Sequence, residues 1–406
     1  MLSDNQLLKA KKLFEISKNS TFYRGKYINY EELKDYEDFF KIPILSKDEI
    51  IGREHHLLTK DYNQNNIIED YTSGTTGKAM TCYHSIKERN YKAYKLWKNR
   101  RKNANILPLD KRALFSPYYA FLEGEKIFFD DEDNDLYLSN INMTDEDMKD
   151  YFNALVEFKP KWFTSVPSAL YLFSNYILRE KLNVEEIGLE MIEVNGEMLF
   201  DYQKNIIEEV FGKILFNHYG SRETWCLAYS CKYGNLHGYD EDFIYELINI
   251  DTEGIGELVV TDLCNNTWPL LRYNLGDKVK LLSHDCGCGN NSIILDVVGG
   301  RKQEDFEIDG WIGNSVIFHY SVSRINSEFG HSIKQYQIIQ QASNSFLINI
   351  VKGHGYQTLH GELLVKEILS KIPIGINIML NYVKEIENTG NKFIYFKKEV
   401  NHNDKR

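Results

Sequence analysis

The period of apolar and polar positions changes several times along the chain. Residues 1–60 place apolar residues at helical spacing among charged ones, and Ser46 is a suitable N-cap for a helix that follows it. Residues 66–73 predict a short strand that runs into a loop, and residues 83–104 carry many charges at helical spacing. The first part of the chain is therefore expected to be mostly helical, with one strand before the loop.

The rest of the chain predicts two kinds of sheet. Residues 147–230 alternate helix-like and strand-like segments, which favours an α/β layered core with parallel strands. Residues 243–300 instead contain short alternating strands separated by Gly, Asn and Asp, as in an antiparallel sheet or barrel. A polar junction at 299–310 precedes a mixed segment that is long enough for a small α+β domain.

Length and composition restrict the class of protein. At 406 residues the chain is too long for one compact core, and its 43% apolar and 26% charged residues are ordinary for a soluble globular protein. Its net charge of −11, without a long basic stretch, argues against nucleic acid as a partner. We find no apolar segment of membrane-spanning length and no signal-peptide core, so we expect a cytoplasmic protein without membrane association.

The six cysteines suggest a metal site. A disulfide framework is not expected in a cytoplasmic protein. Cys286 and Cys288 in the sequence CGCG are close enough to share a metal ion, and four of the six cysteines lie between residues 226 and 288. We therefore consider a local zinc site, with unliganded loop thiols as the alternative.

A loop rich in Gly and hydroxyl residues follows the first predicted strand. Glycine lets the backbone approach a ligand closely, and N–H and O–H groups can donate to phosphate oxygens. The loop does not have the Walker spacing, since only two residues separate Gly74 from Gly77. Such a loop alone is common, but the complete run predicts a phosphate site made by Thr72, Ser73, Gly74, Thr75, Thr76, Gly77 and Lys78.

The sequence YGSRE, which ends at Glu223, is the second motif. It follows an apolar strand, so Glu223 is expected near the carboxyl end of that strand, where ligand sites of open α/β sheets lie. A carboxylate near a triphosphate is a natural Mg²⁺ ligand. The alternative, for the motif alone, is an exposed turn.

Two further motifs are ambiguous by themselves. Asp277 follows a Gly turn in RYNLGD and could accept hydrogen bonds from two ribose hydroxyls, although Gly-Asp is a common turn pair. Lys392 in Gly-Asn-Lys could bring positive charge to a reacting phosphate or carboxylate, although a surface lysine is the simpler interpretation.

The order of the motifs decides between these alternatives. TSGTTGK, Asn195-Gly196-Glu197, YGSRE, RYNLGD, GGRKQEDFEIDG and TGNK follow one another as in the adenylate-forming superfamily of acyl-CoA synthetases, peptide-synthetase adenylation domains and luciferases. The compact length, the stretch from FYRGKY to IPILSKDEI, and PLLRYNLGD followed by CGCG resemble the phenylacetate–CoA ligase and CapK-like branch. The resemblance covers nearly the whole chain.

The resemblance implies an α/β fold with two domains. Residues 1–303 would form a large N-terminal adenylation domain of layered α/β subdomains, with a distorted β-barrel at about 240–300. Residues 304–406 would form a small, mobile α+β domain that carries the catalytic lysine.

The resemblance also assigns roles by position. Lys392 matches the catalytic lysine, Glu223 the Mg²⁺ ligand and Asp277 the ribose-binding aspartate. The ATP-binding positions would further include the phosphate loop from Thr72 to Lys78 and Gly196, Glu197, Tyr219, Gly220, Ser221 and Arg301.

Three departures from the family pattern stand out. Arg222 replaces the usual Thr or Ser before the metal-binding glutamate, and an arginine there could still contact the α-phosphate. The hinge aspartate falls on Glu304, with Asp305 one residue later. Asn274-Leu275 replaces the usual Arg-Thr before Gly-Asp. None of these changes removes an essential group, so an active enzyme is expected.

The implied chemistry is the activation of a carboxylic acid by ATP and Mg²⁺ to an acyl adenylate, followed by transfer of the acyl group to a thiol. This reaction needs no protein nucleophile, so no cysteine requires a catalytic role. A Cys₃His set suited to structural Zn²⁺ would instead be Cys231, His237, Cys286 and Cys288.

The resemblance also indicates which carboxylic acid is the substrate and which thiol accepts the acyl group. The branch favours aryl acids, and aromatic side chains expected near the acyl pocket are Tyr118, Tyr119, His218 and Trp225. Size and composition are also similar to the dihydroxybenzoate-activating ligases of petrobactin-type siderophore biosynthesis, which implies the phosphopantetheine thiol of an aryl carrier protein. Alternatives are a phenylacetate-type ligase using free CoA, an acyl-activating enzyme of surface-polysaccharide biosynthesis, and a silent nucleotide-binding subunit. The resemblance also allows a homodimer.

Overall fold

The chain forms two compact units, each built from two separate segments. One unit contains residues 1–108 and 216–298, and the other contains residues 109–215 and 299–406. The computed structural model describes residues 3–27, 32–60, 64–72, 80–116, 125–141, 143–283, 285–301, 304–308, 311–330, 332–387 and 393–399. Within this described part, no helix is long and apolar enough to cross a membrane.

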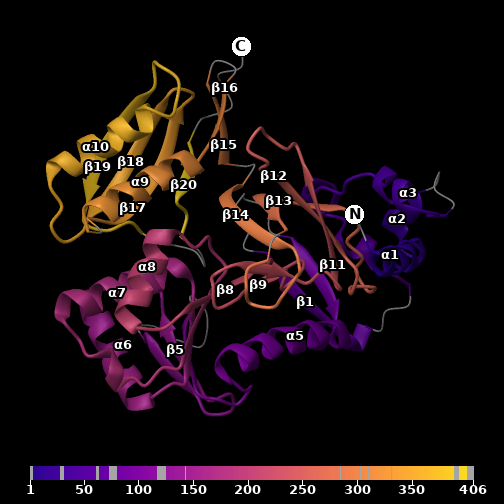
Figure 1. Cartoon of the computed structure of the whole chain (residues 1–406), viewed down its shortest axis with the longest axis horizontal. Helices are drawn as coiled ribbons and strands as arrows, with labels where there is room; N and C mark the ends of the chain where they lie inside the picture. Colours follow the sequence, from indigo (N-terminus) through magenta and orange to yellow (C-terminus); the bar gives the residue numbers. More distant parts are fainter. Residues whose placement is uncertain are drawn as a thin grey trace. The chain divides into compact units, whose positions relative to one another are not determined.

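The first unit begins with short helices and a two-stranded hairpin (Figure 1). Its N-terminal elements are α1 (Asp4–Ser17), α2 (Thr21–Lys26), α3 (Tyr36–Lys41), α4 (Lys47–Ile50), β1 (Ile67–Tyr71), β2 (Thr81–Ser85) and α5 (Ile86–Ala104). Two 3₁₀ turns, Glu54–Leu57 and Gln64–Asn66, precede β1. The helical prediction for residues 1–60 and the strand before the loop are thus confirmed. The long charged helix is also present, but it begins at Ile86 and not at residue 83, because residues 81–85 pair with β1 as a second strand that the sequence pattern did not predict.

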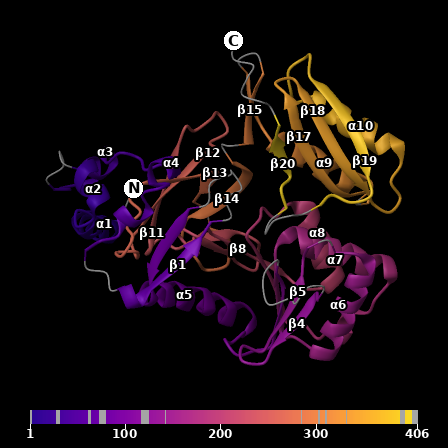
Figure 2. The ribbon, with the colours of Figure 1, turned by 180° about the vertical axis from the view of Figure 1, so that it is seen from behind.

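Helix α5 starts where the sequence offers a reciprocal cap. The Ser85 N–H donates to Glu88 Oε2 at 2.9 Å, and the Glu88 N–H donates to Ser85 Oγ at 3.3 Å. The helix lies next to β1 (Figure 2). Arg89 on α5 forms an ion pair with Asp70 on β1. This ion pair connects α5 to the C-terminal end of β1, which precedes Thr72.

Antiparallel strands complete the first unit. They are β8 (Leu215–Tyr219), β9 (Ala228–Ser230), β10 (Leu236–Gly238), β11 (Phe243–Ile248), β12 (Gly256–Asp262), β13 (Tyr273–Leu282) and β14 (Ile294–Arg301). Their order is β11-β12-β13-β14-β10-β9-β8. The pairs β11–β12, β12–β13, β14–β10, β10–β9 and β9–β8 are antiparallel. The antiparallel prediction for residues 243–300 is confirmed. A single core joins the N-terminal helices to these strands through residues such as Phe14, Trp268 and Tyr273.

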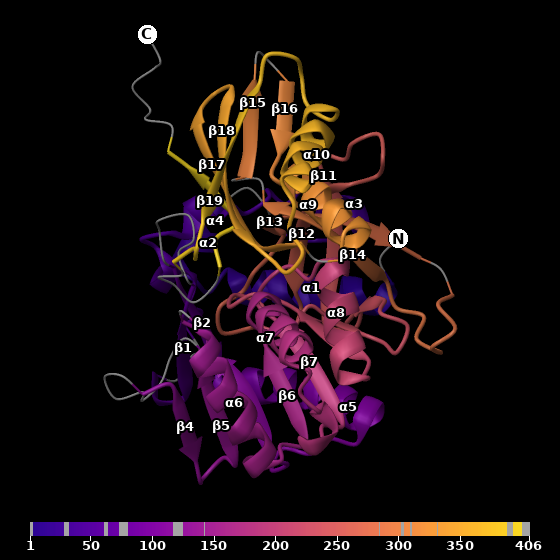
Figure 3. The same cartoon turned by 90° about the vertical axis from the view of Figure 1, so that its left-hand side faces the viewer.

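The first half of the second unit is a layered α/β core. It contains β3 (Arg112–Ser116), β4 (Ile127–Asp130), β5 (Asp135–Ser139), α6 (Asp145–Phe158), β6 (Trp162–Ser165), α7 (Pro167–Glu180), a 3₁₀ turn (Val184–Glu186), β7 (Met191–Asn195) and α8 (Asp201–Phe211). Strands β5, β3, β6 and β7 are parallel neighbours, and β4 is antiparallel to β5. Helices α6, α7 and α8 gather on one face of these strands (Figure 3).

The second half of this unit has its own core. It contains β15 (Asp305–Ile308), β16 (Trp311–Asn314), α9 (Val316–Glu328), β17 (Ile333–Ala342), β18 (Ser345–Lys352), α10 (Thr358–Leu369), β19 (Asn377–Val383) and β20 (Phe396–Lys398). The sheet order is β19-β18-β17-β20, with α9 and α10 packed on it around Phe318, Phe346 and Leu364. The mixed α/β fold is as predicted, whereas the domain boundary at residue 303 stays a prediction.

Candidate active site

Glu223 lies in a tight loop after β8 and is almost fully buried. Only 6% of the surface of Glu223 is exposed. Glu223 Oε1 accepts a hydrogen bond from the Tyr273 hydroxyl at 3.2 Å and lies 3.7 Å from Lys47 Nζ. Burial raises the pKa of Tyr273, and the Glu223 charge raises it further, so the phenol remains a donor. A buried carboxylate held in this way suits a hard divalent cation such as Mg²⁺.

Lys47 is a functional candidate that the sequence reasoning missed. Leu45 pairs with Tyr273 in an isolated bridge, which brings α4 beside the start of β13. Lys47 Nζ lies 3.4 Å from Thr72 Oγ1, in addition to its contact with Glu223. The ammonium group therefore lies between the predicted metal ligand and the first residue of the predicted phosphate loop. The sequence contained one indication of a functional role for Lys47. A lysine in the first turn of a helix interacts unfavourably with the helix dipole, so its position there calls for another reason.

Thr72 is the first residue of the predicted phosphate loop, and Met80 follows the loop in the sequence. The Thr72 N–H donates to the Met80 carbonyl at 2.9 Å, and the Met80 N–H donates to Thr72 Oγ1 at 2.9 Å. The antiparallel pairing of β1 and β2 thus continues to the two residues that bracket the loop. The other predicted loop residues, Ser73, Gly74, Thr75, Thr76, Gly77 and Lys78, lie outside the described residues.

Asp277 projects from an irregularity in β13. Glu257 of β12 is opposite Lys278, whereas Val259 is opposite Asn274, so two steps on β12 face four steps on β13. The extra residues of this bulge include Gly276, whose φ of 76° suits glycine, and Asp277. Asn274 supports the turn, because its Oδ1 accepts the Gly276 N–H at 2.8 Å. Asn274, which stands where an arginine is expected from the resemblance, therefore stabilises this turn.

The bulge brings together two predicted nucleotide-binding residues. The Tyr219 hydroxyl donates to Asp277 Oδ2 at 2.7 Å, although the two residues are far apart in the sequence. Tyr219 ends β8, and Asp277 lies within β13. An aromatic ring next to an anchored carboxylate is a suitable surface for a base and its ribose.

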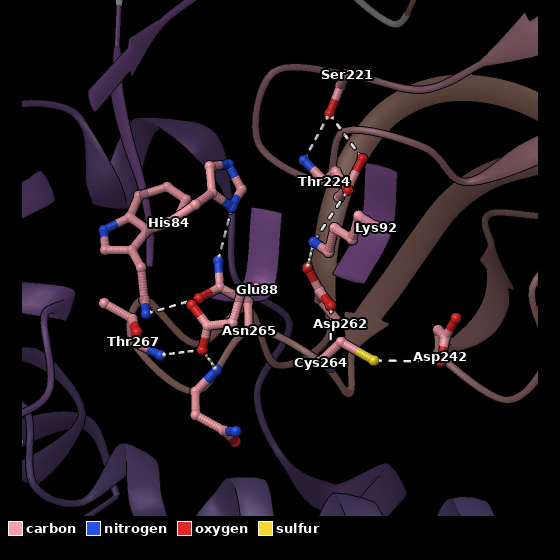
Figure 4. A network of polar contacts seen from close by, with 12 residues as sticks. His84, Glu88, Lys92, Ser221, Thr224, Asp242, Asp262, Cys264, Asn265 and Thr267 are labelled. Atoms are coloured by element: carbon pink, nitrogen blue, oxygen red, sulfur yellow. Dashed lines mark hydrogen bonds and ion pairs between the residues drawn. The ribbon is translucent and has the colours of Figure 1, made fainter. Parts of the chain in front are cut away.

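The loop between β8 and β9 is folded tightly around Glu223. A side chain at Gly220 would collide with the Trp225 carbonyl oxygen, so only glycine fits there. Ser221 Oγ lies 3.0 Å from Thr224 Oγ1 and accepts the Thr224 N–H at 3.3 Å (Figure 4). Trp225 has a positive φ of 67°, which an aromatic residue rarely adopts. The motif thus encodes a strained, well-defined turn.

Other predicted residues lie beside this turn. Arg222 is half exposed, and its Nη1 lies 3.5 Å from Asp70 Oδ1. The Arg89 guanidinium stacks on the Trp225 ring. His218 is on β8 opposite Tyr229 and points to the opposite face of the strand from Tyr219. The assignment of His218 and Trp225 to an acyl pocket stays a prediction.

Gly196 and Glu197 follow β7 in the second unit. Gly196 has a φ of 83°, which permits the sharp turn after the strand. Glu197 Oε2 accepts the Ser168 N–H at 3.1 Å, in the first turn of α7. Glu197 Oε1 accepts the Phe393 N–H at 2.9 Å. This carboxylate therefore links β7, α7 and the residue directly after Lys392 in the sequence.

Several predicted residues cannot be placed. Tyr118, Tyr119 and Lys392 lie outside the described residues. Arg301 ends β14, and its backbone alone is described. Their proposed roles therefore stay predictions.

The four predicted zinc ligands do converge. The ligand atoms of Cys231, His237, Cys286 and Cys288 all lie within 4.8 Å of one another. His237 Nε2 is 3.0 Å from Cys286 Sγ and 3.3 Å from Cys288 Sγ. Three thiols and one imidazole are a donor set that fits tetrahedral Zn²⁺, and the Ser292 hydroxyl, 3.4 Å from His237 Nδ1, could orient the ring.

The chain is similar in sequence to one family model and to several characterised proteins. A family model described as the CapK C-terminal domain matches residues 313–398. The indoleacetate–lysine synthetase of Pseudomonas savastanoi is 27% identical over 304 residues, which are 74% of this chain and 72% of that protein. Protein CapK of Staphylococcus aureus is 26% identical over 289 residues, which are 66% of this chain and 60% of that protein. The phenylacetate-coenzyme A ligase of Thermus thermophilus is 27% identical over 38% of this chain and 37% of its own length.

Solved structures agree in fold. A 2-hydroxyisobutyryl-CoA ligase in complex with 2-HIB-AMP has a TM-score of 0.74 at 16% identity, covering 96% of this chain and 88% of that chain. The anthranilate CoA ligase AuaEII in complex with anthranoyl-AMP has a TM-score of 0.56 at 14% identity, covering 83% and 67%. The fold predicted from the order of the motifs is thereby confirmed.

Proposed function

We propose that this chain, an adenylate-forming acid ligase related to the phenylacetate–CoA ligase and CapK-like branch, activates an aryl carboxylic acid with ATP. The observation that supports this most is the pair of nucleotide-type contacts within one unit. Glu223 is buried beside Lys47 and Thr72, and Asp277 is held by Tyr219 on the neighbouring part of the same unit.

The roles that we propose for the site residues follow from the charges of the reactants. The carboxylate oxygen of the acid would attack the α-phosphorus of ATP, a P–O bond would form, and the bond to pyrophosphate would break. Two anions repel, so Lys47 and Arg222 would offset phosphate charge as the reactants approach. Mg²⁺ held by Glu223 would supply further neutralisation at the phosphates. Asp277 would accept hydrogen bonds from the ribose, and Tyr219 would lie along the base.

The proposed second step transfers the acyl group to a thiol. We propose a dihydroxybenzoate-type acid and the phosphopantetheine of an aryl carrier protein as the pair, as in siderophore biosynthesis. Free CoA with a phenylacetate-type acid is the alternative, and a role in surface-polysaccharide assembly is a further one. An amine acceptor is a second candidate function, because the relative in Pseudomonas savastanoi is named for joining indoleacetate to lysine.

Acid-dependent exchange of pyrophosphate into ATP tests the first step. We would screen benzoates, hydroxybenzoates, arylacetates, fatty acids and amino acids with the intact chain. Exchange with hydroxybenzoates would support the proposal, whereas exchange with another class would replace the acid. No exchange with any acid, from folded and zinc-replete protein, would contradict the proposed activity. CoA, a phosphopantetheinylated carrier protein and lysine, supplied to the preformed adenylate, would then identify the acceptor.

Lys47→Met is expected to weaken ATP binding. Loss of a charged hydrogen bond to phosphate costs about 1.5–3 kcal/mol, which corresponds to a KM for ATP raised by about 10- to 150-fold. Exchange kinetics over a range of ATP concentrations measure this change. Lys41→Met, on the exposed end of α3, is the matched control and should leave the KM unchanged. An equal KM in both variants would remove Lys47 from the phosphate site.

We also propose that Cys231, His237, Cys286 and Cys288 hold a structural Zn²⁺. The ion would join the loop after β9 to the loop between β13 and β14. Metal analysis should find about one Zn²⁺ per chain. Its ligands would be deprotonated thiolates and a neutral imidazole, so chelators should extract it more readily at low pH.

Cys286→Ser is expected to lose this metal and to unfold at a lower temperature. The matched control is Cys264→Ser, because Cys264 lies outside the cluster and its thiol contacts Asp242 at 3.3 Å. Elemental analysis and thermal unfolding of both variants measure the effect. Full zinc content in the Cys286 variant would show that these residues do not form the site.

A further inference from the structure

Two buried side chains contact the backbone on either side of Glu223. His84 Nε2 lies 3.1 Å from the Arg222 carbonyl oxygen, and Lys92 Nζ lies 3.1 Å from the Thr224 carbonyl oxygen. His84 is in β2 and Lys92 is in α5, directly after the predicted phosphate loop in the sequence. Neither residue is part of the motifs that identify the family. Figure 4 shows both side chains within one polar network.

The hydrogen bonds around His84 determine which ring nitrogen carries the proton. Asn265 Oδ1 accepts the Trp268 N–H at 2.9 Å, so the other end of this amide is the donor. Asn265 Nδ2 lies 3.2 Å from the Tyr83 carbonyl and 3.3 Å from His84 Nδ1, which must therefore accept. The proton is then on Nε2, which donates to Arg222. Burial lowers the pKa of His84 to about 3, so the ring stays neutral.

Lys92 is fixed by a buried ion pair. Lys92 is 4% exposed and Asp262, its partner, is 0% exposed. Asp262 is itself held, because its Oδ1 accepts the Cys264 N–H at 3.1 Å. A buried charge is costly unless it is paired, so the ammonium group has little freedom to leave this position. Its donation to Thr224 is therefore made from a fixed point.

We propose that His84 and Lys92 are positioning residues that hold the Arg222–Thr224 backbone so that the Glu223 carboxylate is fixed for binding Mg²⁺ with ATP. This inference rests on the proposed function, in which Glu223 is the metal ligand. The backbone is held on both sides of the glutamate, while Tyr273 holds the carboxylate itself.

A purely structural role would lower stability without a specific effect on metal binding, and the test must separate the two. His84→Phe removes the donor and keeps a flat ring, whereas His84→Gln retains an N–H donor at similar reach. Lys92→Met removes the ammonium group, and Lys98→Met, at an exposed position of the same helix, is the matched control. Thermal unfolding establishes that each variant is folded.

The measurement is Mn²⁺ binding in the presence of ATP, followed by electron paramagnetic resonance, together with the Mg²⁺ dependence of pyrophosphate exchange. Removing a group that orients a metal ligand typically costs 10- to 100-fold in affinity, so His84→Phe should raise the half-saturating metal concentration by about tenfold or more. His84→Gln should restore most of the affinity, and Lys98→Met should match the unchanged chain. Lys92→Met should behave as His84→Phe does, if it folds.

Unchanged metal affinity in folded His84→Phe would overturn the proposal, even if Lys92→Met fails to fold. Equal losses in His84→Phe and His84→Gln would also overturn it, since the donor would then not matter. An unchanged chain that binds Mn²⁺–ATP but exchanges no pyrophosphate would contradict the proposed activity alone. An unchanged chain that does not bind Mn²⁺ with ATP would contradict both.

Discussion

Glu223→Gln is expected to slow acyl-adenylate formation by about 10²–10³-fold, the range seen when one preorganised electrostatic group is removed from a reacting centre. Glutamine keeps the shape and can still accept the Tyr273 hydroxyl, but it lacks the charge that Mg²⁺ requires. The half-saturating Mg²⁺ concentration should rise in parallel. Pyrophosphate exchange measured over a range of Mg²⁺ concentrations records both changes.

Two further variants calibrate this result. Tyr273→Phe leaves the Glu223 charge in place and removes one hydrogen bond, so its effect should be much smaller. Glu253→Gln, in an exposed turn, should have no effect. If Glu223→Gln retained the Mg²⁺ dependence of the unchanged chain, the metal would have to be held elsewhere.

Lys392→Ala is the second change with a large expected effect. It should reduce adenylation by several orders of magnitude and leave ATP binding nearly intact, because a lysine that meets the reacting carboxylate and phosphate acts mainly in the transition state. Exchange kinetics and equilibrium binding of ATP separate the two. Lys397→Ala, at an exposed position of β20, is the control. Unchanged adenylation in Lys392→Ala would show that the C-terminal motif is wrongly aligned.

Phe393, the residue that follows Lys392 in the sequence, is hydrogen-bonded within the second unit. The Phe393 N–H donates to Glu197, which also caps the first turn of α7. Glu197, from one predicted motif, therefore contacts the residue that directly follows another predicted motif in the sequence, almost two hundred residues later. The resemblance assigns Glu197 to the ATP site by position, and its contacts add a structural role for the same side chain.

Local pattern predicted the elements well, because period and capping are local properties. The strand before the phosphate loop, the long charged helix and the change from parallel to antiparallel strands were predicted in this way, whereas β2 and the start of the helix after Ser85 were not. The convergence of Cys231 with Cys286 and Cys288 was predictable too, since few residue types bind zinc.

The partners of the motif residues were not predictable. Tyr273 lies fifty residues from Glu223, and Lys92 lies 170 residues from Asp262. Nothing in a single sequence connects such pairs, because the contacts depend on the packing of distant strands. The turn at Asn274 illustrates the same limit, since its replacement of the family residue has meaning only once the bulge in β13 is known.

The bulge in β13 also restricts how this segment can change over evolutionary time. Side chains alternate between the two faces of a strand, so inserting or deleting one residue between Asn274 and Lys278 would turn Asp277 away from Tyr219. Replacing Leu275 with another residue would leave the count, and hence the direction of Asp277, unchanged. We therefore expect homologous chains to vary here in residue type but to keep the same number of residues between these two strand positions.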